Sequence, residues 1–246
     1  LPWSDLGFAI GEPVSVPREA SPEELEACRL AVESSLNTAT QLAYERAHAD
    51  PTRATPGLPR GSTKPGMRLW AYRAFTSLAR PAVPLLLNMR ARRGKEDPSR
   101  RDERLGRPSI ARPAVKLVWV HAASVGETNA VLPLMGQLRE RRPELSFLLT
   151  TGTVTSATLA AERLGPNALH QYAPLDAPEY VRGFLDHWHP DLAIFTESEI
   201  WPNLILESAK RDIPLALVNG RMTKRSYRRW RRTPGVARPL FSRFSL

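Results

Sequence analysis

The sequence predicts an α/β fold in which an open, Rossmann-like parallel sheet is covered by helices on both faces. Short continuous apolar runs, typical of strands buried on both faces, recur between residues 116 and 218. Stretches with apolar residues at helical spacing separate these runs. The loop after most of the runs carries glycine, hydroxyl or acidic side chains, and ligands bind beyond this edge of such sheets.

The elements of this sheet follow one another in regular order. Five strands are expected, at Leu117–Val120, Ser146–Thr150, His170–Ala173, Leu192–Phe195 and Leu215–Val218, of which the third has the weakest apolar pattern. Helices are expected between them, with their apolar faces at residues 131–138, 157–164, 181–188 and 201–205. Right-handed crossovers between such strands give a Rossmann-like half.

The rest of the chain divides into three further pieces. Residues 1–50 contain a helix that begins at Ser21, with Pro22 at the first helical position and acidic residues after it. Residues 51–66 hold four prolines and three glycines, which predicts a linker. Residues 67–112 form a basic segment, and residues 113–246 carry the sheet. Because the chain starts at Leu1 and stops inside an apolar, basic stretch, we expect a fragment.

The segment 67–112 alternates arginines with Trp, Tyr, Phe and Leu. An apolar face with arginine-rich flanks is typical of helices that lie in a membrane interface, here broken at Pro81 and Pro84. The longest uncharged run, Pro81–Met89, has nine residues, whereas about 20 are needed to span a bilayer. This segment is therefore expected to lie on a membrane without crossing it. The alternative is a helix pair that packs into the core with solvated arginines.

Composition and charge exclude several classes of protein. Of the 246 residues, 42% are hydrophobic and 24% charged, as in globular domains, and the single Cys28 excludes a disulfide framework. The net charge of +10 is uneven, with +8 in residues 67–112 and +9 in residues 221–246, against −3 in residues 1–66 and −4 in residues 113–220. The two basic blocks attract polyanions, which include nucleic acid, an anionic membrane and a phosphorylated lipid. Residues 1–10 lack the pattern of a secretory signal.

The loop after the first strand reads His121-Ala-Ala-Ser-Val-Gly-Glu127. Glu127 falls at the start of a helix, where the helix dipole favours an ionised carboxylate, so it is a candidate general base or a capping acid without chemistry. Ala122-x-Ser124-x-Gly126 also resembles a loosened nucleophile elbow, which predicts a serine hydrolase that uses Ser124. That hydrolase would need a histidine partner, and His170, His187 and His189 all lack a strand-end position.

The second loop, Thr150–Ser156, combines hydroxyl side chains with Gly152 at a helix start. Such a loop suits phosphate or sugar oxygens, although capping by threonine explains it equally well. It lacks the Gly-Lys-Ser/Thr pattern of nucleoside triphosphate sites. Candidate ligand-binding residues here are Thr150, Thr151 and Thr153.

The fourth strand runs into Glu197-Ser-Glu199-Ile-Trp201-Pro-Asn203, and the fifth ends in Asn219-Gly-Arg221. If the fourth strand continues, Glu197 and Glu199 share one side of it. Acids from two strand ends, an arginine and a hydroxyl loop favour sugar chemistry over hydride transfer, and no Gly-x-Gly-x-x-Gly follows any strand. The pair His187 and His189 is too incomplete to predict a metal site.

Residues 67–246 resemble the N-terminal half of the bacterial 3-deoxy-D-manno-octulosonic acid (Kdo) transferases. Seven ordered motifs carry this resemblance: Arg93-Gly-Lys-Glu96 with Glu103-Arg-Leu-Gly106, the His121–Glu127 loop, the Thr150–Thr155 loop, Pro174-Leu-Asp176, Glu197–Asn203, Val218–Arg221, and Ser226.

The resemblance implies an inverting glycosyltransferase built from two Rossmann-like domains (GT-B type), which lies peripheral or monotopic on the cytoplasmic face of the bacterial inner membrane. It implies transfer of Kdo from CMP-Kdo to the lipid A precursor (lipid IVA), without a metal or other cofactor. Glu127 takes the place of the general base and Glu197 that of the transition-state stabiliser. The acceptor-binding residues we expect are Ser124, Gly126, Thr150, Thr151, Thr153, Glu199, Trp201, Asn203, Asn219 and Arg221.

The same resemblance selects partners for the two basic blocks, namely the anionic inner-membrane surface and the phosphorylated acceptor rather than nucleic acid. It also implies a C-terminal donor domain beyond Leu246, so we expect this fragment to be inactive alone. Residues 1–50 are similar to the C-terminal tail of a lysophospholipid acyltransferase-like protein, as a fusion or as a reading frame that passes through a start at Met67. The other class of function that remains open is a non-catalytic peripheral membrane or lipid-binding module.

Overall fold

The computed structural model describes residues 17, 21–46, 65–197, 199–220 and 222–244. The chain forms two compact units, residues 1–57 and 58–246, and each is described by itself. In the first, α1 (Pro22–Arg46) follows Ser21, whose hydroxyl accepts a hydrogen bond from the Glu24 amide at 3.3 Å. The Glu24 carboxylate accepts from the Ser21 amide at 2.8 Å, which completes a capping box. The predicted helix start is thus confirmed, while most of the predicted linker lies outside the described residues.

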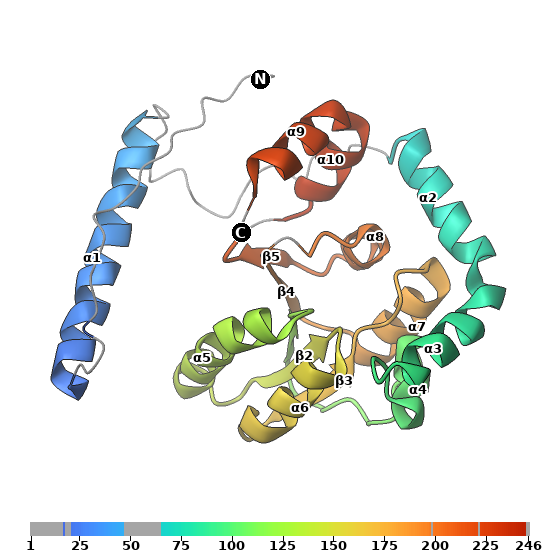
Figure 1. The fold of residues 1–246 in the computed structure, drawn as a ribbon, viewed down its shortest axis with the longest axis horizontal. Coiled ribbons are helices and arrows are strands. Elements are labelled where there is room, and N and C mark those ends of the chain that lie inside the picture. The colour runs from blue at the N-terminus through green and yellow to red at the C-terminus, as the bar shows by residue number, and fades with distance from the viewer. Residues whose placement is uncertain (1–16, 18–20, 47–64, 198, 221, 245–246) are drawn as a thin grey trace. The chain divides into compact units, whose positions relative to one another are not determined.

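The second unit is built on a five-stranded parallel sheet of order β3-β2-β1-β4-β5 (Figure 1). Its strands are β1 (Leu117–His121), β2 (Ser146–Thr151), β3 (Ala168–Tyr172), β4 (Leu192–Thr196) and β5 (Leu215–Val218). All five predicted strands are therefore present, and β3 begins two residues earlier than expected. The predicted α/β, Rossmann-like class is confirmed, with β1 at the centre.

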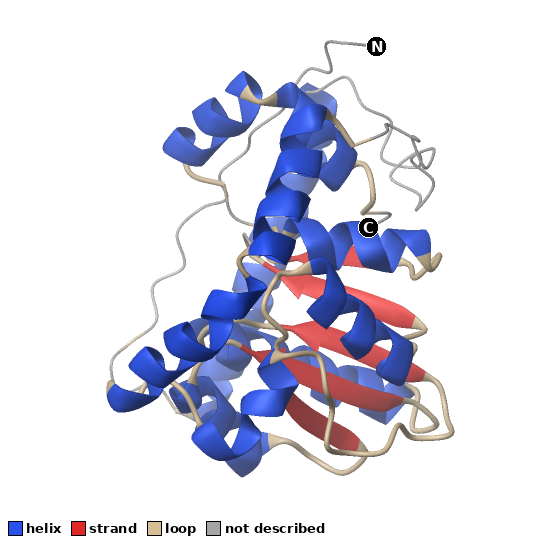
Figure 2. Cartoon of the chain, turned by 90° about the vertical axis from the view of Figure 1, so that its right-hand side faces the viewer, coloured by secondary structure: helices blue, strands red, loops and turns tan. Residues whose placement is uncertain are grey.

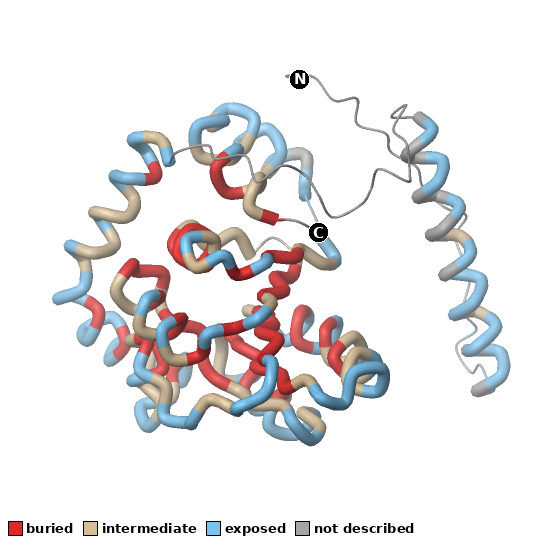
Figure 3. Tube along the Cα trace, turned by 180° about the vertical axis from the view of Figure 1, so that it is seen from behind, coloured by how far each residue is buried: buried red, intermediate tan, exposed pale blue. Residues whose placement is uncertain are grey.

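Two helices, α5 (Val125–Arg141) and α6 (Val154–Arg163), cover one face of this sheet. Alternate strand residues such as Val120 point to this face and pack with Met135 of α5 and Ala160 of α6. Buried positions cluster along the strands and the inner sides of the helices (Figure 3). The apolar runs are continuous because the opposite face is covered as well.

The opposite face carries α7 (Pro178–Trp188) and α8 (Pro202–Lys210). Figure 2 shows helices on both sides of the strands. Trp119 of β1 points to this side, and its ring centroid lies 4.9 Å from that of Phe184 in α7 and 5.2 Å from that of Phe195 in β4. These aromatic residues belong to the larger of the two hydrophobic clusters, which lie on opposite faces of the sheet.

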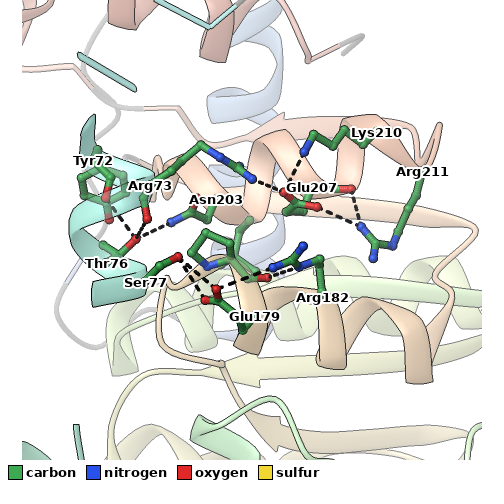
Figure 4. Close-up of polar contacts among 12 residues, drawn as sticks. Tyr72, Arg73, Thr76, Ser77, Glu179, Arg182, Asn203, Glu207, Lys210 and Arg211 are labelled. Atoms are coloured by element: carbon green, nitrogen blue, oxygen red, sulfur yellow. Dashed lines mark hydrogen bonds and ion pairs between the residues drawn. The ribbon is translucent and has the colours of Figure 1, made fainter. Parts of the chain in front are cut away.

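The basic segment folds into α2 (Met67–Leu78), η2 (Arg80–Ala82), α3 (Val83–Arg92), η3 (Pro98–Arg100) and α4 (Arg101–Arg104). The predicted break occurs at Pro81, whereas Pro84 lies in the first turn of α3 and does not interrupt it. Figure 4 shows α2 bonded to α7 and α8: Arg73 pairs with Glu207, and the Ser77 hydroxyl donates to Glu179 at 3.1 Å. Part of this segment therefore packs into the core.

The remainder of α2 and α3 presents apolar side chains outward. Leu69, Val83 and Leu87 are buried, but seven large apolar side chains are exposed: Met67, Trp70, Phe75, Leu78, Leu85, Leu86 and Met89. Within the described part of the chain, no helix is both long and apolar enough to pass through a membrane.

After β5, the chain forms α9 (Lys224–Arg232) and α10 (Pro234–Phe241). The rings of Trp230 and Phe241 meet edge to face with centroids 5.3 Å apart, and Leu240 is buried in the cluster on the α7 side. Arginines of α9 stay exposed, so this end of the unit is strongly basic.

Gly106, at the end of the loop after α4, tests how closely the basic segment is packed. It has φ +72°, and an added Cβ would lie 1.9 Å from the carbonyl oxygen of Tyr180 in α7. We expect Gly106→Ala to lower the free energy of unfolding by about 3 kcal/mol or more, from left-handed strain plus overpacking. The control is Gly94→Ala, at φ +64° with open space around it, which should cost only about 1 kcal/mol. If the two variants lose the same free energy of unfolding in urea, the loop after α4 does not pack tightly against α7.

Candidate active site at the carboxyl ends of the central strands

The site lies where β1 and β4 end side by side. The two strands pair in parallel from Val118 with Leu192 to His121 with Phe195. The connections that leave this edge diverge, because α5 covers one face and α8 the other. This is the topological switch point at which open α/β sheets bind ligands.

Glu127 is held at this edge by three donors. It lies in the first turn of α5 after the N-cap Ser124, and its side chain is buried, with the residue 6% exposed. Its Oε2 accepts from the Ala123 amide at 2.9 Å and from the Thr196 hydroxyl of β4 at 2.8 Å. Its Oε1 accepts from the Ser124 hydroxyl at 2.7 Å. The carboxylate is thus fixed in one orientation from β1, α5 and β4.

The three hydrogen bonds do not fill every acceptor position of the Glu127 carboxylate. A carboxylate offers about four lone-pair positions, and the three donors occupy two on Oε2 and one on Oε1. The neighbouring Ser124 and Gly126 are exposed, whereas Glu127 itself is 6% exposed. Glu127 is thus held in the first turn of α5 as a capping acid would be, and its role as a general base stays a prediction.

Glu197 follows β4 in a conformation that the sequence did not predict. It has φ +49°, and Asn219, which follows β5, has φ +50°. The Glu197 amide donates to the Val218 carbonyl at 3.1 Å, and the Asn219 side chain donates to Glu197 Oε1 at 3.5 Å. The sequence placed Glu197 and Glu199 on one side only if the fourth strand continues, and that condition is not met because β4 ends at Thr196. The left-handed turn sets their directions instead.

Glu199 nevertheless shares an electrostatic environment with the other two acids. The indole of Trp201 donates to its Oε2, and His121 Nε2 lies 4.0 Å from the same oxygen. Burial raises the pKa of Glu199 above its ordinary value, the Trp201 hydrogen bond lowers it, and the charges of Glu127 and Glu197 raise it further. The surroundings of Glu199 therefore favour its protonated form.

His121 is enclosed behind Glu199 at the end of β1. Its Nδ1 lies 3.0 Å from the Thr150 hydroxyl, which accepts a hydrogen bond from Trp119 Nε1 at 2.8 Å. Its Nε2 is buried and has no hydrogen-bond partner among the described residues. Burial, and then the nearby charge of Arg104, lower the pKa of His121 to about 4.

The lowered pKa makes stability depend on pH. An unfolded histidine takes up its proton near 6.5, whereas folded His121 does so near 4. The folded state therefore binds fewer protons, and its stability is lost as the pH falls from 6.5 to 4. We expect a loss of about 3 kcal/mol from this residue alone. Urea unfolding should show that the free energy of unfolding of the native chain falls between pH 7 and pH 4. In His121→Gln, this fall should be smaller by about 3 kcal/mol. Equal losses would contradict the burial of His121.

The threonine loop serves mainly as internal support. Thr150 and Thr151 are fully buried, and the Thr151 hydroxyl lies 3.0 Å from His170 Nε2. Thr153 is half-buried and caps α6 by accepting from the Ser156 amide at 3.2 Å. Of the three predicted ligand-binding threonines, only Thr153 reaches the surface in this structure.

Asn203 belongs to the packing behind the site. It is fully buried, and its side-chain amide donates to the Asp176 carbonyl at 2.6 Å and to Thr76 of α2 at 3.2 Å. Asp176 accepts in turn from the amides of Asn203 and Leu204, and from the Tyr72 hydroxyl at 2.8 Å. These contacts tie the start of α8 to α2 (Figure 4).

The other predicted residues lie at the rim or outside the described chain. Ser124 and Gly126 are exposed, Trp201 is half-buried, and Arg221 lies outside the described residues. The hydroxyl of Ser124 bonds to Glu127, and no described histidine forms a hydrogen bond with it. Among the described residues, no three His, Cys, Asp or Glu side chains are arranged to hold a metal ion.

Two residues that support the site were not predicted from the sequence. Thr196 bonds Glu127 because β4 lies in register with β1, which no local pattern reveals. Arg104 of α4 donates to the Gly152 carbonyl at 2.6 Å, and the Gly152 amide donates to the Ala123 carbonyl at 3.0 Å. Arg104 thus supports the loop that carries the Ala123 donor to Glu127. The only available signal was its place in the Glu103–Gly106 motif.

An open parallel sheet with a fixed carboxylate and two further acids at its switch point defines a Rossmann-like α/β domain with a ligand-binding edge. Residues 99–246 match the family described as 3-deoxy-D-manno-octulosonic-acid transferase (kdotransferase). The chain belongs to this family, as the motifs had indicated.

Relatives in bacteria and plants carry the same name. The probable mitochondrial 3-deoxy-D-manno-octulosonic acid transferase of Arabidopsis thaliana is 42% identical over 159 residues, 65% of this chain and 36% of that protein. The transferases of Rickettsia bellii and Haemophilus influenzae are 37% and 33% identical, over 73% and 72% of this chain and 42% of each relative. The chain thus spans about two fifths of the length of these relatives.

Proposed function

We propose that this chain is the acceptor-binding half of an inverting, GT-B-type Kdo transferase that acts in lipopolysaccharide synthesis. The donor is CMP-Kdo and the acceptor is the lipid A precursor, lipid IVA. Family membership supports the reaction class, and the single observation that carries the role of this half is the held carboxylate of Glu127.

In this proposal, Glu127 is the general base. An acceptor hydroxyl donates its proton to the open position on Oε1 as its oxygen attacks the anomeric carbon of the donor sugar. The bond from that carbon to the phosphate oxygen breaks, and CMP leaves with the electron pair. The three donors to Glu127 keep it oriented, so little reorganisation is needed when the proton moves.

Glu197 stabilises the transition state in the same scheme. Positive charge develops on the sugar ring as its bond to phosphate breaks, and a nearby carboxylate favours that charge. The left-handed conformation of Glu197 at a strand end is the kind of strain that functional sites hold.

The acceptor is bound by the residues that reach the rim, supported by those behind them. The rim residues are Ser124, Gly126, Thr153, Glu199, Trp201 and Asn219, with Thr150, Thr151 and Asn203 as the layer that positions them. Arg221, which lies outside the described residues, is the remaining residue that we propose to bind the acceptor.

The exposed apolar side chains of α2 and α3 support a membrane-facing role for residues 67–112. Apolar residues flanked by arginines bind at the headgroup boundary of anionic leaflets. We place this surface on the cytoplasmic face of the inner membrane, beside an acceptor domain formed by residues 113–246. Residues 1–50 remain assigned, as a prediction, to an acyltransferase-like tail joined by the linker 51–66.

The test joins this chain to the C-terminal half of the Haemophilus influenzae relative; we call the product the fusion enzyme. With CMP-Kdo, a lipid A precursor and a membrane mimic, the fusion enzyme should transfer radiolabelled Kdo to the lipid. A folded fusion enzyme that binds the lipid and the donor but transfers nothing would favour a non-catalytic lipid-binding module, which the exposed apolar surface also suits.

A further inference from the structure

A cavity of about 300 Å³ lies between α2, α8 and the residues after α10, within the second unit. Three of its lining residues are cationic, namely Arg73, Lys210 and Arg243. The other lining residues are largely apolar and include Trp70, Leu206 and Ala209. Lys210 ends α8 shortly before β5 begins, so the cavity lies toward the amino ends of the strands, away from Glu127.

The side chains around this cavity include more cations than carboxylates. Glu207 is paired with Arg73, with Lys210 at 3.0 Å and with Arg211 at 3.3 Å, so one carboxylate faces three cations (Figure 4). Arg211 also pairs with Asp186. Arg243 forms no ion pair with any residue that the structure describes.

Two of these cations also hold unused donors. Arg73 Nη1 and Arg243 Nε are buried and have no hydrogen-bond acceptor in the described part of the chain. A buried donor of a charged group without an acceptor is costly, so the described part of the chain leaves neither guanidinium fully paired. Lys210 uses one of its three donors on Glu207 and keeps its side chain 60% exposed, so it can turn toward such an anion.

The rim of the cavity is apolar on the α2 side. Trp70 is 68% exposed, and the neighbouring Met67 is 85% exposed. An amphipathic aromatic ring beside a cationic pocket suits a molecule whose anionic head enters the pocket while its hydrocarbon lies on the helix. Arginine forks pair well with phosphate oxygens.

We propose that this cavity binds the phosphate headgroup of a membrane lipid, with its acyl chains along the exposed apolar side of α2. The site anchors the chain to a membrane through α2 and α8. It rests on the membrane-facing role proposed for residues 67–112 but not on sugar transfer, because no residue of the cavity belongs to the candidate active site.

The test measures binding of the full chain to vesicles of phosphatidylcholine that contain either phosphatidic acid or phosphatidylserine at matched surface charge. We expect at least tenfold tighter binding to the vesicles with phosphatidic acid, whose phosphomonoester is compact and exposed. The variant Lys210→Gln/Arg243→Gln should lose this preference. Its matched control, Lys116→Gln/Arg141→Gln, removes one lysine and one arginine that are exposed elsewhere and should keep the preference.

Equal binding to the two anionic lipids by the native chain, or equal losses in the two variants, would overturn the proposal. Titration with inorganic phosphate separates the two possible sources of the anion: competition in the millimolar range is expected, whereas phosphate binding without a phosphatidic acid preference would overturn the lipid assignment. If the double variant unfolds in a thermal melt, Arg243→Lys keeps the charge and loses the fork, and should still reduce the preference. Failure here would leave transfer by the fusion enzyme unaffected.

Discussion

The Glu127→Gln variant of the fusion enzyme is expected to transfer Kdo roughly 10²- to 10⁴-fold more slowly than the native form, the range that a positioned general base contributes. The amide has nearly the same shape as the carboxylate but cannot accept the proton of the acceptor hydroxyl. Its oxygen can take the place of Oε2 and accept from Ala123 and Thr196. Its nitrogen then faces the Ser124 hydroxyl, which can rotate to accept.

This exchange of hydrogen bonds predicts a folded protein with a selective defect. The free energy of unfolding should change by about 1 kcal/mol or less, and the loss should appear in kcat rather than in the KM for the acceptor. Glu140→Gln, an exposed acid on the same helix α5, is the matched control and should leave kcat unchanged. Transfer at the native rate by Glu127→Gln would remove Glu127 as the base.

The Arg104→Met variant is expected to lower the free energy of unfolding by about 3–5 kcal/mol, the usual cost of breaking a buried ion pair from one side. Arg104 is 5% exposed, and its Nε bonds Glu96 Oε2 at 3.0 Å. Its two terminal nitrogens donate to the carbonyls of Ala173 and Gly152, and its guanidinium lies 4.7 Å from the ring centroid of Tyr172. Methionine fills the space but leaves Glu96 and both carbonyls with fewer partners.

Urea unfolding of the full chain measures this loss directly. Arg107→Met is the control, because that arginine is exposed and only 3.5 Å from the equally exposed Asp102, so its removal should cost less than about 1 kcal/mol. Glu96 keeps its ion pair with Arg90 at 2.9 Å in Arg104→Met, so the double variant Glu96→Gln/Arg104→Met should recover little of the loss. A cost below 1 kcal/mol for Arg104→Met would contradict the role of α4 as a support for the Gly152 loop.

Much of the sheet could be predicted because its strands are buried on both faces. Their apolar runs, such as Leu117–Val120, are continuous, and only the partly exposed start of β3 was misplaced. The short α4 could not be predicted, since a four-residue helix shows no periodicity. It is held instead by Arg104 and by Glu103, which accepts a hydrogen bond from the Tyr172 amide at 2.7 Å.

The site was predictable only as far as local position decides it. Glu127 follows from a strand, a turn and a helix start, all visible in the sequence. The contact of its donor Thr196 depends on the pairing of β4 with β1. The direction of Glu197 depends on a left-handed turn that the local sequence does not predict. Thr150 was expected to face a ligand but is turned inward toward Trp119 and His121, because aromatic rings surround that position.

Binding of the acceptor to this chain alone tests the central claim most directly. Isothermal titration or intrinsic tryptophan fluorescence would follow the addition of a lipid A precursor in detergent to the full chain, with CMP-Kdo in a parallel titration. We expect saturable binding of the precursor and little binding of CMP-Kdo, with affinity for the precursor largely kept in Glu127→Gln. Tight binding of CMP-Kdo together with no binding of the precursor would show that this half serves the donor and would contradict the account.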